Sequence, residues 1–228
     1  MTQNPTPSLD PLTALQSVPI FSEVHDDTLN GLVSAAEVKE LVRGDVLFNE
    51  GDEPNSLHIV LSGRIAIVMT SEVDDRESVV ALMDSGDLFG ELGLLDSGAR
   101  SATARAIEPT SILEIRYDDV RKIFDEQPDL VWAAARMLAQ RLRTMDEALS
   151  DSVFLDVTGR TAKRIIELSE GEDEFTIPVT QEELAGMVGA SRERVNKAIS
   201  SFVRLGWLEQ HDRNYRILQR NELSIRAR

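Results

Sequence analysis

The sequence predicts an α+β protein in which an N-terminal antiparallel β jelly roll is followed by a long helix and a C-terminal winged helix-turn-helix domain. Short strands separated by turn residues run from Gly44 to Tyr117, as in an antiparallel barrel or jelly roll. A heptad seam follows, and two short helices joined by a glycine turn lie near the C-terminus. We expect three parts, at residues 1–128, 129–156 and 157–228.

Composition narrows the function classes. The 228 residues are 42% hydrophobic and 28% charged, which is ordinary for a globular protein. Cysteine is absent, which excludes disulfides, zinc–thiolate sites, iron–sulfur clusters and thiol nucleophiles. The N-terminus "MTQNPTPSLDP" has neither a basic region nor an apolar core, so we expect no secretory signal. No apolar run approaches the roughly 18 residues of a membrane span, and we expect a cytoplasmic protein without a membrane partner.

The charge is divided unevenly along the chain. The formal net charge is −16, of which residues 1–150 carry −15 and residues 151–228 carry −1. Residues 192–228 alone carry nine basic and four acidic side chains, a net of +5. The C-terminal end is therefore the part suited to a phosphate backbone.

The N-terminal elements follow from local patterns. Residues 14–21 and 26–41 are predicted to form short helices. "SLHIVLSGRIAIVM" alternates apolar and other residues around Ser62-Gly63, which predicts a hairpin there. Residues 79–90 and 101–117 continue the run of strands, each interrupted by Gly, Pro or Asp.

A helical period replaces the strands after residue 117. One short helix is expected at residues 117–127, and Pro128 then suits the first turn of a long helix from Asp129 to Ser152. Its apolar residues recur at spacings of four and three: Val131, Ala135, Leu138, Leu142, Met145 and Leu149. This seam fits a coiled-coil partner, so we expect a homodimer through residues 129–153. Packing of the helix against the chain's own barrel is the alternative.

The C-terminal part begins after a short interruption. Asp156 is placed to cap a helix from Val157 to Ser169, with a hinge at residues 154–156. The acidic segment 170–175 is expected to be an exposed turn, and residues 207–218 are expected to form a two-stranded wing.

The helix pair between them is predicted from "VTQEELAGMVGASRERVNKAISSFVRLGWLE". Thr180 and Glu183 form a capping box, Gly189 allows a sharp turn, and Ser191 can cap the second helix. The inner face comprises Leu184, Ala185, Val188, Val195, Ile199 and Phe202. A plain helical hairpin is the alternative to a helix-turn-helix.

The second helix of this pair carries polar residues near its start, as a helix does that enters the major groove of double-stranded DNA. The predicted DNA-facing residues are Thr180, Gln181, Ser191, Arg192, Glu193, Arg194, Asn196 and Lys197. Arg and Lys suit guanine, and Glu accepts from the amino group of cytosine.

The stretch "GELGLLDSGARSA", residues 90–102, indicates an anion site. A turn from Gly90 exposes backbone N–H groups, Arg100 adds a charged donor fork, and Ser101 can donate its hydroxyl. Glu91 only accepts hydrogen bonds, so it suits a ribose hydroxyl. Leu92, Leu94 and Leu95 are expected to pack the turn onto the barrel. An internal ion pair between Glu91 and Arg100 is the alternative.

Three motifs together resemble the cyclic AMP receptor protein (CRP/FNR) family of bacterial transcription regulators: "GDLFGELGLLDSGARSATARA", "FLDVTGR" and "GASRERVNKAI". The resemblance spans about Leu12 to Leu218. It implies a cyclic-nucleotide effector, most simply cAMP, no covalently bound cofactor, no enzymatic activity, and RNA polymerase as a further partner. It also implies a palindromic operator with half-sites like TGTGA, read by Arg192, Glu193 and Lys197. The family often has Arg at the third of these positions.

The resemblance implies ligand-binding roles for Gly90, Glu91, Leu92, Arg100, Ser101, Arg141, Met145 and Asp146. Met145 and Asp146 occupy the positions where cAMP-binding members have a Thr followed by Ser or Asn. Met145 cannot replace a hydroxyl, and Asp146 suits the adjacent donors of guanine better than adenine. A guanine nucleotide, cGMP or cyclic di-GMP, is therefore an alternative effector, as is action without a nucleotide.

Two other classes of protein are alternatives to this interpretation. A cupin-type metalloenzyme needs clustered ligands, whereas His25, His58 and His211 are predicted in a helix, a strand and the wing, so we expect no metal site. A haem-based sensor needs an axial ligand, for which His58 is a poor candidate.

Overall fold

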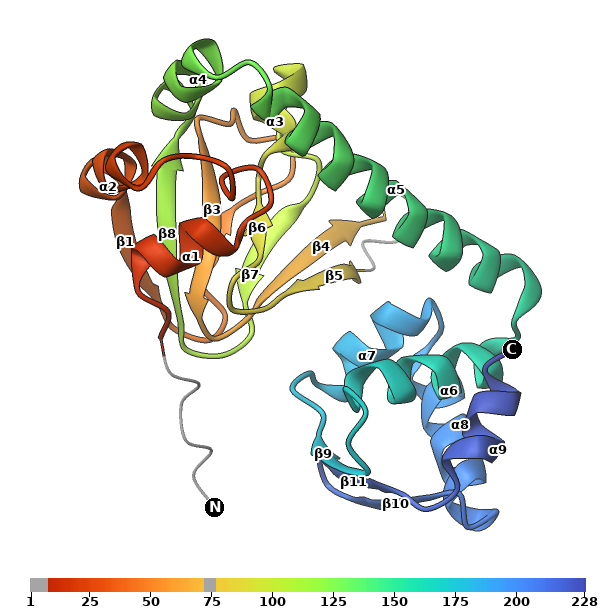
Figure 1. Ribbon diagram of the computed structural model, residues 1–228. Coiled ribbons are helices and arrows are strands. Elements are labelled where there is room, and N and C mark those ends of the chain that lie inside the picture. The colour runs from red at the N-terminus through yellow and green to blue at the C-terminus, as the bar shows by residue number, and fades with distance from the viewer. Residues whose placement is uncertain (1–7, 72–76) are drawn as a thin grey trace. The chain divides into compact units, whose positions relative to one another are not determined.

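The computed structural model describes residues 8–71 and 77–228. The chain divides into two compact units, residues 1–70 with 80–142 and residues 71–79 with 143–228 (Figure 1). The segment through residue 7, which carries most of the N-terminus in which we expect no secretory signal, lies outside the described residues. Among the helices of the described ranges, none combines the length and apolar character that crossing a bilayer requires.

The first part of the chain forms two four-stranded sheets with helices. The sheets have the strand orders β1-β8-β3-β6 and β2-β7-β4-β5. The elements are α1 (Pro11–Ser17), α2 (Asp26–Ala35), β1 (Glu37–Leu41), β2 (Val46–Phe48), β3 (Ser56–Ser62), β4 (Ile65–Thr70), β5 (Glu77–Met83), β6 (Leu88–Phe89), α3 (Leu92–Asp96), β7 (Thr103–Ala106), β8 (Thr110–Arg116) and α4 (Tyr117–Glu126). The predicted jelly-roll layout of antiparallel strands is confirmed.

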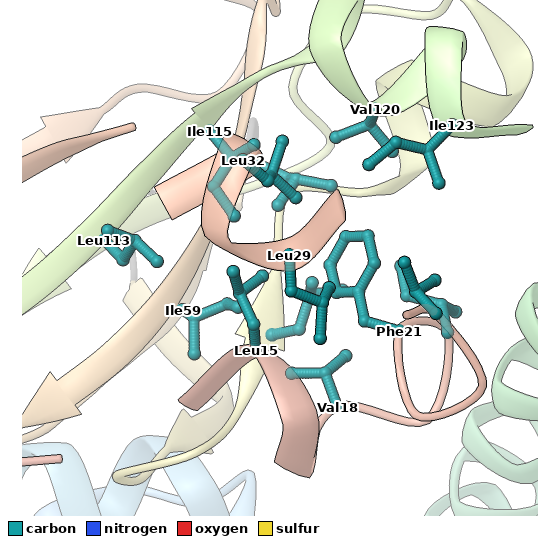
Figure 2. Close-up of a cluster of buried hydrophobic side chains, with 14 of the residues drawn as sticks. Leu15, Val18, Phe21, Leu29, Leu32, Ile59, Leu113, Ile115, Val120 and Ile123 are labelled. Carbon is teal, nitrogen blue, oxygen red and sulfur yellow. The ribbon is translucent and has the colours of Figure 1, made fainter. Parts of the chain in front are cut away.

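Strand β3 is buried on both faces, because a different hydrophobic core lies against each face. Leu57, Ile59 and Leu61 belong to the core beneath α1, α2 and α4, and Figure 2 shows Ile59 among the side chains of these helices. Val60, with the opposite parity, belongs to a second core between the sheets. His58 shares the parity of Val60 and lies directly opposite Glu114 of β8.

Two predictions for this part are wrong. Residues 37–41 form strand β1, paired with β8, and not the end of a helix; pairing along a sheet edge outweighs their helical propensity. The Ser62-Gly63 turn does not close a hairpin, because β3 and β4 lie in different sheets. Gly63 has φ 79°, and a Cβ there would lie 2.3 Å from the carbonyl oxygen of Pro109, so the turn is a tight crossing between the sheets.

Helix α5 (Leu130–Phe154) begins two residues after Pro128 and runs two residues beyond the predicted end. Ala133, Ala134 and Leu130 are buried. Most of the large apolar residues of the heptad seam are exposed: Val131 53%, Leu142 59%, Met145 66% and Leu149 65%. The chain's own barrel therefore covers the N-terminal turns of the helix and leaves most of the seam open.

The C-terminal part contains α6 (Val157–Leu168), β9 (Glu174–Thr176), α7 (Gln181–Val188), α8 (Arg192–Arg204), β10 (Leu208–His211), β11 (Asn214–Ile217) and α9 (Arg220–Arg226). Asp156 caps α6 as predicted, accepting a hydrogen bond from the Gly159 N–H at 2.8 Å. Arg226 of α9 pairs with the same carboxylate. No pattern in the sequence predicted α9. The wing has a third strand, because Glu174 and Phe175, expected in a turn, pair with β11.

Candidate ligand pocket and DNA interface

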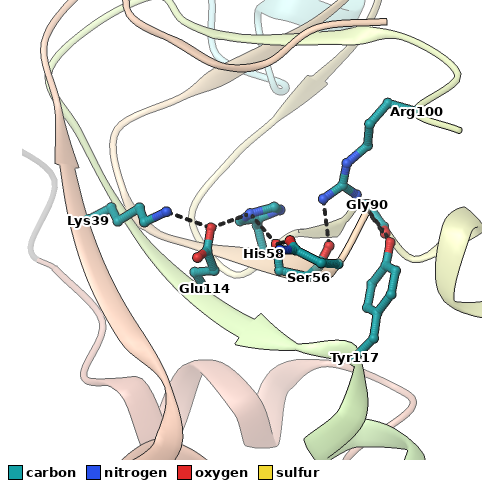
Figure 3. Close-up of polar contacts among 8 residues, drawn as sticks. Lys39, Ser56, His58, Gly90, Arg100, Glu114 and Tyr117 are labelled. Atoms are coloured by element: carbon teal, nitrogen blue, oxygen red, sulfur yellow. Dashed lines mark hydrogen bonds and ion pairs between the residues drawn. The ribbon is translucent and has the colours of Figure 1, made fainter. Parts of the chain in front are cut away.

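Arg100 is a buried cation, 8% exposed, in the loop before β7. Its Nη1 donates to the Gly90 carbonyl at 3.0 Å and to the Tyr117 hydroxyl at 3.2 Å. Its Nη2 donates to the Ser56 carbonyl at 2.7 Å (Figure 3). The guanidinium carbon lies 4.1 Å from the centroid of the Phe48 ring. Burial lowers the pKa of Arg100 and the neighbouring Tyr117 opposes that shift, but an arginine stays charged in proteins. A fixed positive charge therefore lies beside the turn at Gly90.

Gly90 makes room for this arginine. It has φ 81°, a backbone conformation that favours glycine. A Cβ at this position would lie 2.6 Å from Arg100 Nη1, 3.3 Å from His58 Nδ1 and 3.4 Å from the Ser56 carbonyl oxygen. The turn thus depends on glycine for both its backbone angle and its space.

Glu91 joins the same turn to helix α5. Its side chain is buried and forms an ion pair with Arg141 of α5. Arg141 also donates to the carbonyl of Leu88. The sequence left open a pair between Glu91 and Arg100, but the acid has Arg141 as its partner instead.

The other predicted ligand residues are less enclosed. Leu94 is 8% exposed and holds α3 to the core, whereas Leu92 is 42% and Leu95 40% exposed. The prediction that all three leucines pack inward is therefore wrong, since a short helix turns residues three apart to the same, outer side. Ser101 is exposed beside Arg100.

Met145 and Asp146 are exposed on α5. They follow Leu142, where the first unit ends.

Sequence reasoning missed the position of His58. It is 1% exposed, and its Nε2 lies 3.0 Å from Glu114 Oε2 and 3.4 Å from the Ser56 hydroxyl. The hydrogen bond from His58 lowers the pKa of Glu114 to about 2, and burial lowers the pKa of His58. The ring stacks on Phe89 at 5.2 Å between centroids. His58 lies two residues before Val60 in strand β3, so the two side chains point to the same face of the sheet. This alternation was the signal in the sequence for an interior position.

The predicted helix-turn-helix is present in α7 and α8. Thr180 and Glu183 make the capping box, and Gly189 adopts φ 67° at the turn. Ser191 occupies the N-cap of α8 without a side-chain capping bond. The buried face of the pair comprises Leu184, Ala185, Val188, Val195, Ala198, Ile199 and Phe202.

The opposite face of α8 is polar. Arg192, Glu193, Arg194 and Lys197 are exposed and Asn196 is half-buried. Two other predicted DNA contacts already serve the fold: Thr180 caps α7, and the Gln181 amide donates to the Tyr215 hydroxyl at 3.0 Å. The first turns of α8 therefore carry the polar surface that can read bases.

No group of metal-ligating side chains occurs within residues 8–71 and 77–228. His25 sits at the N-cap of α2 and not inside a helix, and His211 ends strand β10.

Comparison with known proteins gives two family matches. Residues 38–127 match the cyclic nucleotide-binding domain, and residues 159–225 match the Crp-like helix-turn-helix domain. A "CRP-like cAMP-activated global transcriptional regulator" of Mycobacterium tuberculosis is 33% identical over 216 residues, covering 92% of this chain and 96% of that protein. The chain belongs to the CRP/FNR family of transcription regulators. Members of this family bind DNA and are not enzymes.

Other CRP/FNR relatives agree. The "cAMP-activated global transcriptional regulator CRP" of Pasteurella multocida is 32% identical over 181 residues, covering 76% of this chain and 86% of its own. Among solved structures, the c-di-GMP responsive regulator CLP of Xanthomonas campestris matches with TM-score 0.74 and 25% identity, over 85% of this chain and 99% of that one. The Thermus thermophilus catabolite activator protein is 27% identical with TM-score 0.53, covering 92% of this chain and 98% of its own. As a CRP/FNR member, this protein is a ligand-gated DNA-binding regulator with a cyclic nucleotide-binding domain.

Proposed function

We propose that this regulator binds a palindromic operator as a homodimer and that a cyclic nucleotide, first of all cAMP, sets its affinity for DNA. The observation that carries the proposal is the ion pair between Glu91 and Arg141. It joins the turn expected to hold the nucleotide to the helix that carries the exposed seam. A ligand that competes with Arg141 for Glu91 changes the contacts of α5. A ligand that makes different contacts in two conformations shifts the equilibrium between them.

The pocket residues suit a cyclic nucleotide. Arg100 uses three of its five N–H bonds on protein acceptors, which leaves donors for a phosphate. Ser101 adds an exposed hydroxyl next to it. Glu91 is an acceptor for a ribose hydroxyl, and Arg141 is positioned to follow any movement of that carboxylate.

The homodimer is supported by the seam of α5. Leu142, Met145 and Leu149 are each about two-thirds exposed, at 59%, 66% and 65%. Exposed apolar residues at heptad spacing mark a coiled-coil interface. A parallel pair of these helices gives the protein a two-fold axis, which an operator palindrome mirrors.

At the DNA, Arg192, Glu193 and Lys197 are the proposed base readers, with Arg194 and Asn196 beside them. Arg192 and Lys197 suit guanine and Glu193 suits cytosine, in keeping with half-sites like TGTGA. Thr180, Gln181 and Ser191 lie at helix starts, where backbone N–H groups and side chains contact phosphates. By family resemblance, RNA polymerase is the further partner.

The alternative effector is a guanine nucleotide. Asp146 offers an acceptor where adenine-binding relatives have a hydroxyl or an amide, and the Xanthomonas relative is named for its response to cyclic di-GMP. Titration calorimetry with cAMP, cGMP and cyclic di-GMP, with and without operator DNA, tests the proposal on wild type and Asp146→Ala. If the protein prefers cAMP and Asp146→Ala leaves this preference unchanged, Asp146 has no base-reading role. No binding of any nucleotide refutes the proposed effector class.

A further inference from the structure

Three neighbouring strands carry a line of polar side chains into the interior of the barrel. Lys39 of β1 lies 2.8 Å from Glu114 of β8, and the same carboxylate oxygen lies 3.0 Å from His58 Nε2 on β3 (Figure 3). The side chain of Lys39 is 36% exposed, that of Glu114 20% and that of His58 1%. The line therefore runs from the surface to a buried imidazole.

The state of the imidazole follows from its partner. Glu114 has a pKa of about 2, so it is a carboxylate at neutral pH and its oxygen accepts the hydrogen on His58 Nε2. A neutral ring then has a bare lone pair on Nδ1. This Nδ1 is buried and has no hydrogen-bond partner among the described residues. A buried polar atom left in this way needs a reason.

The unpartnered nitrogen lies on the same side of the ring as Gly90 and Arg100. A Cβ added at Gly90 would lie 3.3 Å from His58 Nδ1 and 2.6 Å from Arg100 Nη1, so both side chains border the turn at Gly90. The charged groups around the ring are Glu114 from β8, Lys39 from β1 and Arg100 from the loop before β7. Phe48 of β2 and Phe89 of β6 place uncharged rings against the imidazole.

Burial and the positive charges of Arg100 and Lys39 oppose a second proton on His58. Burial and the charge of Arg100 both lower the pKa of His58, and the hydrogen bond to Glu114 raises it. A phosphate at Arg100 adds a negative charge on the Nδ1 side of the ring, while Glu114 supplies one on the Nε2 side. With a phosphate bound, the ring lies between two negative charges, which favours the protonated form. Without the phosphate, the charge of Arg100 disfavours that form.

We propose that His58 is a further ligand-sensing residue of this pocket: an anion bound at Arg100 draws one proton from solvent onto His58 Nδ1, so that ligand binding and proton uptake are coupled. This inference rests on the proposed function, since the anion is the phosphate of the cyclic nucleotide. Its consequence is an affinity that rises as pH falls. The slope approaches a tenfold change in Kd per pH unit between the pKa of His58 in the ligand-free protein and its higher pKa in the complex.

The experiment is titration of cAMP into the full-length protein in two buffers of equal pH but different ionisation enthalpy, neither of them phosphate. For wild type, the difference in heat corresponds to uptake approaching one proton per site, and Kd increases with pH. His58→Gln binds cAMP with uptake near zero and a flat pH profile. His25→Gln, which changes a histidine at the N-cap of α2, is the matched control and behaves as wild type.

A second measurement uses the wild-type protein alone, so it does not depend on whether a variant folds. The chain has three histidines, so their side-chain ¹⁵N resonances in wild type are few enough to assign. On addition of cAMP, the His58 Nδ1 resonance shifts from the unprotonated to the protonated range. Tight cAMP binding with equal heats in both buffers and an unprotonated Nδ1 overturns the inference and leaves the proposed function standing. Failure to bind any cyclic nucleotide overturns both.

Discussion

Replacement of Arg100 by leucine removes both the contacts that this side chain makes within the fold and its positive charge. The guanidinium makes three hydrogen bonds inside the first unit and lies 4.1 Å over the Phe48 ring. The Gly90 carbonyl keeps the Tyr117 hydroxyl as a donor after the change, whereas the Ser56 carbonyl loses its arginine partner. The variant therefore loses fold contacts as well as the charge that a phosphate would meet.

The size of each loss follows from these contacts. A hydrogen bond to a charged group contributes about 1.5–3 kcal/mol, and a buried cation over an aromatic ring about 0.5–2 kcal/mol. Because the Gly90 carbonyl stays satisfied and leucine restores apolar contact, we expect the free energy of unfolding to fall by about 2–4 kcal/mol. Domains of this size have roughly 5–15 kcal/mol, so the unit stays folded. Removal of the cation from a buried anion contact costs about 2–5 kcal/mol, which lowers the affinity for cAMP roughly 30- to 5000-fold.

Urea unfolding gives the first quantity and calorimetric titration with cAMP the second. Arg121→Leu is the matched control, because Arg121 lies on α4 in the same unit with a half-exposed side chain, 3.6 Å from Asp118. Its unfolding free energy should change by less than about 1 kcal/mol, with no change in binding. If Arg100→Leu destabilises the unit as expected but binds cAMP within a few-fold of wild type, Arg100 supports only the fold and the reasoning about the pocket is wrong.

Three further predictions concern the other features. Arg192→Ala should weaken binding to the matching operator by about 1–3 kcal/mol and relax the preference at one base pair; equal weakening on all sequences would make Arg192 a phosphate contact instead. Leu149→Glu, at an exposed heptad position, should shift the protein from dimer to monomer in sedimentation equilibrium, and an unchanged dimer would exclude this seam. Glu114 has a pKa lowered from 4.5 to about 2, so its contribution to stability is present above about pH 4.5 and is lost as pH falls toward 2. Glu114→Gln should remove this part of the acid dependence of unfolding, and an identical acid profile for the variant would contradict the assignment.

Local patterns were sufficient for the parts of the fold that depend on neighbours in sequence. The caps at Asp156 and Thr180, the αL turn at Gly189 and the buried face of α7 and α8 all arise from residues three or four apart. Period 3.6 and the capping chemistry are properties of a single helix. The same holds for the heptad seam of α5, whose exposure the structure confirms for Leu142, Met145 and Leu149.

Contacts between distant strands could not be predicted in this way. The pairing of Glu37–Leu41 with β8 and of β9 with β11 joins segments far apart in the chain. A strand takes its stability from such a partner more than from its own residues. For the same reason the pattern around Ser62-Gly63 predicted the turn correctly and the partner strand wrongly.

The sequence by itself determined that this protein has a barrel with an arginine in a glycine-rich turn, a long helix with an apolar seam and a helix-turn-helix with a basic surface. Each of these is a pattern of residue types at fixed spacing. Only the tertiary structure decided that Glu91 is bound to Arg141, fifty residues away, and that the buried His58 lies against Glu114. The register of the sheet and the path of α5 set these partners, and both result from packing across the whole unit, where the balance of many weak contacts selects one arrangement.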